Sequence, residues 1–252
     1  MKHTLTQKLS LLLALVTLGL SANARAYDHT HAEYNTLLET HVKDGLVNYA
    51  ALKAAPAPLD ACLTGFAAVP AAEFKTWTKD QRLAFLINLY NAATLKLIVV
   101  HYPVASIRDI KGPGDSPWKR PEISLFGKMI TLDALENEVI RPEYKEPRIH
   151  FALVCAAISC PPLRSDAYTD ATLTTQLDEQ ATRFLANKSA NRLDGRTLYL
   201  SSIFDWYAAD FTAAAGTLPA YVAPFFPAAD RPALLKKPTV KFTDYNWALN
   251  KS

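Results

Sequence analysis

The stretch TKDQRLAFLINLYNAATLKLIVVH, residues 78–101, carries the clearest helix signal of the chain. Thr78 and Gln81 have the spacing of a capping box, in which each side chain bonds the backbone of the other residue. Behind them apolar residues recur at helical spacing, and Pro103 closes the pattern. The spacing predicts an apolar helix long enough to lie at the centre of the fold.

Shorter elements are predicted on both sides of this helix. The pattern indicates helices over residues 33–41, 132–140, 170–186 and 202–211, and a helical stretch over 50–68 that Pro56 and Pro58 interrupt. It also indicates strands over 122–126 and 128–131, and a hairpin over 192–200 around Asp194-Gly195. The run RIHFALVC, residues 148–155, suits a strand buried on both faces, although a buried helical segment fits the same pattern. We therefore expect one α+β domain over residues 27–252, helix-rich, with a small mixed sheet whose central strand is 148–155.

Composition limits the class of protein. The 252 residues are 50% hydrophobic, 20% charged and 10% aromatic, which is typical of a globular protein and excludes disorder, collagen and coiled coil. The formal charge is +3, but residues 1–26 hold Lys2, Lys8 and Arg25 and no acid. The rest of the chain is formally neutral, so we expect no nucleic-acid partner.

The N-terminus has the features of a targeting signal. Lys2 and Lys8 precede an apolar run over residues 9–20, and small residues follow as far as Ala26. This pattern predicts a secretory signal peptide over residues 1–26, because the apolar run is shorter than the roughly 20 residues that cross a bilayer. No cysteine lies just after the expected cut, so we expect no lipid anchor there. We expect a periplasmic or secreted protein without a stable membrane anchor after cleavage.

Several motifs resemble one protein family, the domain of unknown function 547. They are FLINLYNA (85–92), Leu135-Glu136, PRIHFALVC (147–155) and SCPPL (159–163). The settings of Tyr49, of residues 204–211 and of residues 244–250 are also similar, so the resemblance spans roughly residues 34–250. The family pattern often has His where this chain has Asn137, and Gly where it has Ala156. The resemblance implies no established reaction.

A thiol active site is one interpretation of the polar residues between 88 and 164. Thiol catalysis requires a thiolate, a neighbouring base, a group that orients the base, and donors for an oxyanion. Cys160 is the candidate nucleophile because it follows the predicted strand and precedes Pro161-Pro162. His150 is the candidate base, and Glu136 or an asparagine amide its orienting group. An ion-paired, purely structural Glu136 is the alternative.

Spacing restricts how these groups can meet. On a straight strand His150 and Cys155 would be roughly 16 Å apart and on opposite faces. His150 can reach Cys160 only if the chain reverses after Val154 or Cys155. The alternative for these two positions is a Cys155–Cys160 disulfide or the burial of inert thiols, and Cys62 leaves the cysteine count odd. A metal site is disfavoured because zinc-binding pairs are usually two to four residues apart.

Other polar residues are candidates for substrate binding. Asn88 and Asn91 lie three apart on an apolar helix, where each amide must find hydrogen-bond partners. They either line a cleft as donors or tie down the backbone of a neighbouring segment. Cys155 and Arg164 complete the predicted substrate-binding set. Neither a glycine-rich phosphate loop nor Gly-x-Ser-x-Gly occurs, so we expect no nucleotide cofactor.

Two hypotheses about function follow. The first is an exported, cysteine-dependent hydrolase or transferase that acts on an amide-like bond in the cell envelope. The second is a non-catalytic envelope module that binds a peptide, glycan or protein partner, with Cys155 and Cys160 in a structural disulfide.

Overall fold

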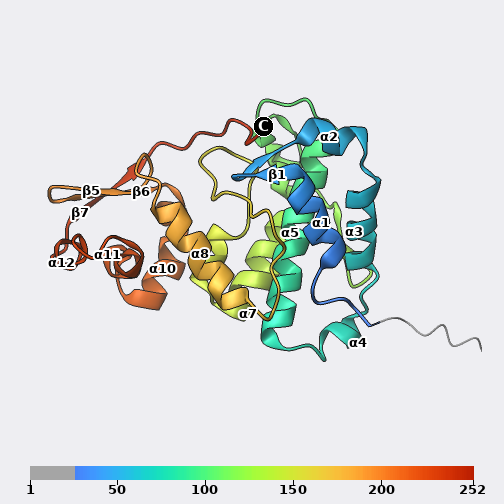
Figure 1. The fold of residues 1–252 in the computed structure, drawn as a ribbon, viewed down its shortest axis with the longest axis horizontal. Coiled ribbons are helices and arrows are strands. Elements are labelled where there is room, and N and C mark those ends of the chain that lie inside the picture. The colour runs from blue at the N-terminus through green and yellow to red at the C-terminus, as the bar shows by residue number, and fades with distance from the viewer. Residues whose placement is uncertain (1–25) are drawn as a thin grey trace, which may run out of the picture.

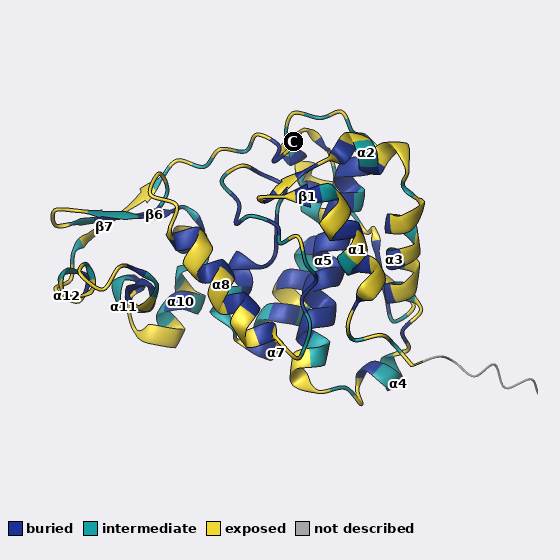
Figure 2. Ribbon diagram, in the orientation of Figure 1, coloured by how far each residue is buried: buried dark blue, intermediate teal, exposed yellow. Residues whose placement is uncertain are grey.

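The helix α5, Lys79–His101, is the axis of the larger part of the molecule (Figure 1). The computed structural model describes residues 26–252, so the predicted signal peptide over residues 1–26 lies, apart from Ala26, outside the described residues. Thr78 and Gln81 form the predicted capping box at the start of α5. The helix is apolar and long enough to cross a membrane, but 89% of its apolar window is buried inside the protein. Figure 2 shows it mostly dark blue, as expected of a core helix.

The N-terminal helices cover one side of α5. They are α1 (Ala32–His41), α2 (Tyr49–Ala54), α3 (Ala57–Ala67) and α4 (Ala71–Phe74), with the two-stranded pair β1 (Val42–Lys43) and β2 (Leu46–Val47) between the first two. Side chains of α1, α2, α3 and α5 form one large apolar core. The helical stretch over residues 50–68 is interrupted at Pro56, as predicted, and forms the two helices α2 and α3.

The middle of the chain alternates short elements. The strands predicted over residues 122–126 and 128–131 are present as β3 (Ile123–Leu125) and β4 (Lys128–Ile130), which pair antiparallel. The helix predicted over residues 132–140 is confirmed as α6 (Leu132–Ala134), which continues as a π-helical turn over Leu135–Ile140 and then as α7 (Arg141–Tyr144). Three short 3₁₀ turns, Ile107–Asp109, Pro113–Asp115 and Pro117–Lys119, precede the hairpin.

A second apolar core organises the C-terminal part. The helix α8 (Leu173–Leu185) packs beside a three-stranded sheet in the order β5 (Arg192–Asp194), β6 (Thr197–Ser201), β7 (Thr239–Thr243). β5 and β6 are antiparallel and joined at Gly195, whereas β6 and β7 are parallel, so the sheet is mixed as predicted. The helices α9 (Ile203–Trp206), α10 (Ala208–Ala215), α11 (Leu218–Val222) and α12 (Arg231–Leu234) lie between β6 and β7 in the chain. The fold is α+β and helix-rich.

The predicted central strand over residues 148–155 is wrong. Residues Pro147–Phe151 form a 3₁₀ helix, and the chain then continues without regular structure to Cys160. Pro147 occupies the first helical turn, and the Glu146 carboxylate accepts the backbone N–H of Arg148 at 3.0 Å. The run is apolar because it lies between the two cores, with Ile149 in the first core and Phe151 in the second.

The C-terminal segment, residues 244–252, returns from β7 to the helices around α5 (Figure 1). The Tyr49 hydroxyl donates to Oδ1 of Asn250 at 2.8 Å. The backbone N–H of Asn250 donates to the carbonyl of Ala156 at 3.0 Å, and that of Ile158 to the carbonyl of Ala248 at 2.8 Å. The last residues therefore hold the loop between Cys155 and Cys160 in place.

Candidate functional site

A cleft of about 240 Å³ lies where α5, the π-helical turn, the 3₁₀ helix 147–151, α9 and the C-terminal segment meet, and we call it the thiol cleft. Its polar lining comprises Tyr90, Ser116, Asp133, Glu136, Asn137, His150, Cys155 and Cys160. Its apolar lining is mostly aromatic and includes Trp118, Trp206, Tyr207, Tyr245 and Trp247. All three residues of the predicted catalytic set, Cys160, His150 and Glu136, therefore reach one cleft.

The two cysteines are brought together by a sharp reversal of the chain. Ala156 has a φ of 59°, in the left-handed region. The backbone N–H of Cys155 donates to Sγ of Cys160 at 2.9 Å, and Sγ of Cys155 lies 3.1 Å from the Tyr245 hydroxyl oxygen. Cys62, Cys155 and Cys160 are all thiols in this structure. The reversal that the sequence analysis required is present, at Ala156.

The two thiols have opposite acid–base properties. The Cys160 thiol and the Tyr245 hydroxyl bond the sulfur of Cys155 and hold the pKa of that thiol below its usual value. Burial, together with the neighbouring Cys155, raises the pKa of the Cys160 thiol. Burial also raises the pKa of Tyr245, so its hydroxyl keeps the proton and donates it to sulfur. Cys160, the predicted nucleophile, is the more buried of the two residues, and the pKa shifts favour a thiolate on Cys155.

His150 does not contact either cysteine. Its Nε2 lies 2.8 Å from Oδ2 of Asp210, and its ring stacks on Tyr207 with centroids 3.8 Å apart. Arg141 completes the group, because its Nε and Nη2 donate to the two oxygens of Asp210 at 2.8 and 3.0 Å. The hydrogen bonds from His150 and Arg141 hold the pKa of Asp210 well below its usual value. His150 lines the cleft, but only 1% of its side chain is exposed to solvent.

Glu136 lines the cleft beside this histidine. It lies on the π-helical turn, and such turns are frequent at functional sites. The Tyr90 hydroxyl donates to its Oε2 at 3.2 Å, and its Oε1 lies 3.9 Å from Nδ1 of His150. The negative charge of Glu136 acts to raise the pKa of the Cys155 thiol. Glu136 is therefore the acid–base group that affects the pKa of the Cys155 thiol, and His150 is its neighbour.

Comparison with known proteins gives one result. Residues 74–185 match the model of the family described as "Protein of unknown function, DUF547". This part of the chain belongs to the DUF547 family. Neither a curated protein nor a solved structure matches the chain. The DUF547 segment carries Glu136, His150, Cys155 and Cys160, whereas Asp210 lies beyond it. The family resemblance expected over roughly residues 34–250 is thus confirmed for residues 74–185.

Within the DUF547 segment the two asparagines hold backbone and do not line the thiol cleft. Asn91 donates from Nδ2 to the carbonyl of Ala152 at 2.9 Å and accepts the N–H of Val154 at 3.0 Å. Asn88 makes the same pair of bonds to the N–H and carbonyl of Tyr168, at 3.0 and 2.8 Å. Each amide replaces a missing backbone partner for an irregular segment. Of the two alternatives, the structure has the one in which they tie down backbone.

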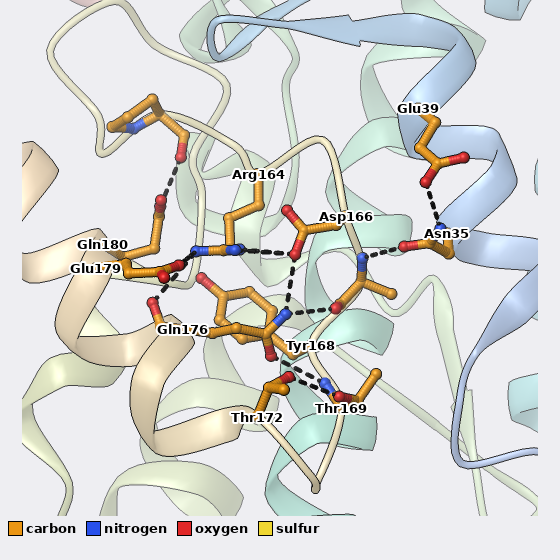
Figure 3. A network of polar contacts seen from close by, with 12 residues as sticks. Asn35, Glu39, Arg164, Asp166, Tyr168, Thr169, Thr172, Gln176, Glu179 and Gln180 are labelled. Atoms are coloured by element: carbon orange, nitrogen blue, oxygen red, sulfur yellow. Dashed lines mark hydrogen bonds and ion pairs between the residues drawn. The ribbon is translucent and has the colours of Figure 1, made fainter.

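Arg164, predicted as a substrate-binding residue, is not part of the cleft lining. Figure 3 shows it in a network of polar contacts. Its Nη2 pairs with Asp166 and its Nη1 with Glu179, each at 2.9 Å. Gln176 of α8 donates to the same Asp166 carboxylate at 3.0 Å. The guanidinium is already bonded in a network that fixes the loop after Cys160 to α8, so we assign it a structural role.

Two departures of this chain from the DUF547 pattern lie at the cleft. Ala156 occupies a position with φ of 59°, which favours glycine. Asn137 lines the cleft, where it donates to Asp133 at 3.1 Å and accepts from Arg141 at 2.6 Å.

No group of three His, Cys, Asp or Glu side chains within residues 26–252 can hold a metal ion, so His150, Cys155 and Cys160 do not assemble into a metal site.

Asp210, Arg141 and the aromatic lining are functional candidates that the sequence analysis did not assign. Asp210 is 60 positions from His150 in the chain, a separation across which no local pattern applies. The signal that could have found it is the motif around residues 204–211, which entered only through the family resemblance.

Proposed function

We propose that this chain is a thiol-dependent hydrolase or transferase that acts on an amide-like bond, with Cys155 as the nucleophile. The observation that supports this most directly is the position of the Cys155 sulfur in a cleft, where a thiol and a phenol both donate hydrogen bonds to it. Such donors stabilise a thiolate, which is the reactive form of cysteine. An inert structural cysteine needs no such donors.

The reaction has two steps. The sulfur of Cys155 bonds the acyl carbon, the bond from carbon to the leaving nitrogen breaks, and a thioester forms. Glu136 receives the thiol proton and returns it to the leaving amine. Water, or an acceptor amine or alcohol, then attacks the thioester carbon and releases the thiol of Cys155. Glu136 suits the proton-carrying role because it faces the cleft and also accepts from Tyr90.

His150, Asp210 and Arg141 act as positioning residues. The Arg141–Asp210 pair fixes Nε2 of His150, so Nδ1 is directed toward Glu136. Stacking on Tyr207 fixes the plane of the ring. This arrangement orients the carboxylate of Glu136, in the way that a third group orients the base in other nucleophilic sites.

Export of the protein is part of the proposal. Its support is the N-terminal pattern of residues 1–26 and the packing of Tyr27 beside Trp77 and Phe85. A cut after Ala26 would leave Tyr27 as the first residue of the folded part. N-terminal sequencing of the protein recovered from the cell envelope and the medium tests this, with Tyr27 as the expected first residue.

The second candidate is a binding module in which Cys155 and Cys160 form a disulfide. The nearness of the two sulfur atoms supports it as well, because the N–H of Cys155 already bonds Sγ of Cys160. In that state no nucleophile exists. The aromatic lining of the cleft would then be the whole of the functional surface.

Trapping of an acyl-enzyme distinguishes the two candidates. The folded protein is mixed with p-nitrophenyl acetate, quenched in acid and mapped by mass spectrometry. The proposal predicts an acetyl group on Cys155, release of p-nitrophenol that falls roughly 100-fold or more in Cys155→Ala, and little change in Cys62→Ala. A quantitative Cys155–Cys160 disulfide in freshly purified protein, or acetylation no faster than in the unfolded chain, overturns it.

A further inference from the structure

The mouth of the thiol cleft carries an aromatic wall made of Trp118, Trp206, Tyr245 and Trp247. Three of the four tryptophans of the chain belong to it. The Trp206 and Trp247 rings stack with centroids 5.7 Å apart and planes at 20°, and Tyr245 lies 4.8 and 4.5 Å from them. Trp118 packs edge-on against Trp247 at 5.8 Å. The wall is built from separate parts of the chain, so it is not the by-product of one apolar helix.

This wall is left open to solvent. Trp206 is 48% exposed, and it is one of the few large apolar residues of the described chain that reach this exposure. Exposed apolar surface inside a concave site indicates ligand binding. Its contact with water is unfavourable in free energy, and a bound ligand would remove that contact. Indole faces also attract cations, and the guanidinium of Arg108 already lies 5.3 Å from the Trp247 ring.

The lining of the cleft also includes acidic side chains. Asp133 and Glu136 line it, and its lining includes no lysine or arginine. Asp133 accepts from the neutral amide of Asn137, and Glu136 from the neutral hydroxyl of Tyr90. Within residues 26–252 neither carboxylate has an ion pair with lysine or arginine; the ionisable partner of Glu136 is His150 at 3.9 Å. A cleft of this kind concentrates cations.

We infer that the thiol cleft binds an organic cation, a substrate whose amino or quaternary ammonium group lies between the aromatic wall and the carboxylate of Asp133. This rests on the proposed function and names its substrate class: an amide-like compound that carries a positive charge close to the bond presented to Cys155. The positive charge of the ligand balances negative charge in the cleft. It offsets the charge of Glu136, which opposes thiolate formation at Cys155.

A neutral sugar is the competing occupant, since a pyranose ring also stacks on an exposed indole. Sugar hydroxyls would bond the two carboxylates without neutralising them. The developing Cys155 thiolate would then add a further negative charge to an acidic cleft. The charge balance therefore favours the cation.

Binding is measured by the change in tryptophan fluorescence on titration, at constant ionic strength. The probes are tetramethylammonium, the neutral isostere tert-butanol, and methyl glucoside. We expect tetramethylammonium to bind tighter than tert-butanol by about threefold to tenfold. Asp133→Asn and Trp206→Ala should each remove that preference, while Asp194→Asn and Phe242→Ala, which lie on the three-stranded sheet, should preserve it. Thermal melts confirm that each variant is folded.

A second readout separates this inference from the proposed function. Saturating tetramethylammonium should raise the rate at which a small neutral alkylating agent modifies Cys155. Equal affinity for all three probes, or preference for the sugar, overturns the inference even if Cys155 is reactive. Selective cation binding to a protein whose Cys155 is inert leaves the cation site standing and overturns the thiol mechanism instead.

Discussion

Cys155 and Cys160 are joined by a hydrogen bond in which the backbone N–H of the first donates to the sulfur of the second at 2.9 Å. Cys160 in turn donates its thiol proton to Cys155, so the two residues are unequal partners. In the proposed mechanism Cys155 carries the negative charge, and Cys160 stabilises that charge as a hydrogen-bond donor. The predictions below follow from this asymmetry and from the groups that build it.

Replacing Cys160 with alanine should make Cys155 less reactive at neutral pH. The substitution removes the largest influence that holds the pKa of the Cys155 thiol down, so the rise of reactivity with pH should move to higher pH. Tyr245→Phe removes the second donor and should act in the same direction. The pH dependence of alkylation by iodoacetamide measures both. An unchanged profile in Cys160→Ala would show that Cys160 has no part in activating Cys155.

Asn91→Ala should destabilise the fold by about 1–3 kcal/mol, because two buried hydrogen bonds are lost. These bonds go to Ala152 and Val154, directly before Cys155, so the rate of alkylation of Cys155 should change as well. Asn88→Ala is the matched control: it loses an equivalent pair of bonds to Tyr168, which does not adjoin Cys155 in the chain. Equal effects of both variants on Cys155 would contradict a role for Asn91 in placing the thiol loop.

Asp210→Asn should reduce stability at neutral pH by about 1–2 kcal/mol, a value lowered to allow for solvent screening of its partly exposed carboxylate. The pKa of Asp210 is lower in the folded than in the unfolded chain. Its contribution is therefore complete above the unfolded pKa of about 4 and is lost as the pH falls toward the folded value. Melting temperatures at a series of pH values should show this acid-side loss in the parent and a smaller one in Asp210→Asn. Parallel curves would refute the linkage.

Ala156→Gly should stabilise the protein by about 0.5–1 kcal/mol, since glycine adopts a positive φ without steric cost. The adjacent buried Ala157 has no positive φ, so Ala157→Gly should destabilise. Chemical denaturation of both variants gives the comparison. Destabilisation by Ala156→Gly would mean that the methyl group of Ala156 contributes packing that outweighs the strain.

Glu73→Gln should lower the melting temperature of protein processed after Ala26 more than that of the unprocessed chain. The backbone N–H of Tyr27 donates to Oε1 of Glu73 at 3.2 Å. After the expected cut this nitrogen becomes a charged amino group, so the contact becomes an ion pair. Differential scanning calorimetry of the two forms, each with and without the substitution, measures the difference. An equal loss in both forms would contradict the expected N-terminus.

The sequence was sufficient wherever a local signal specified the geometry. The capping box of Thr78 and Gln81 marks the start of α5, and Asp194-Gly195 marks the hairpin, because in each case the residues that form the feature are neighbours. The prediction of a strand over residues 148–155 was wrong because an apolar run indicates only that the segment is buried. Strands, helices and irregular segments between two cores can all be buried.

The candidate site was predicted in composition but not in arrangement. Glu136, His150, Cys155 and Cys160 do share one cleft. Their order within it depends on contacts between distant segments, such as Asp210 to His150 and Tyr245 to Cys155, that no spacing rule reveals. In the proposed mechanism, the same contacts exchange the predicted roles of Cys155 and Cys160, and of His150 and Glu136.

The most direct test of the central claim is the pH dependence of alkylation of each cysteine, followed by mass spectrometry on freshly purified protein. Cys62 is an internal reference, because burial raises the pKa of its thiol to about 11. We predict that Cys155 reacts first, with a midpoint below that of an ordinary thiol, about 8.5, while Cys62 and Cys160 stay unmodified. If Cys155 reacts no faster than Cys62, or is found bonded to Cys160, the cleft holds no activated thiol.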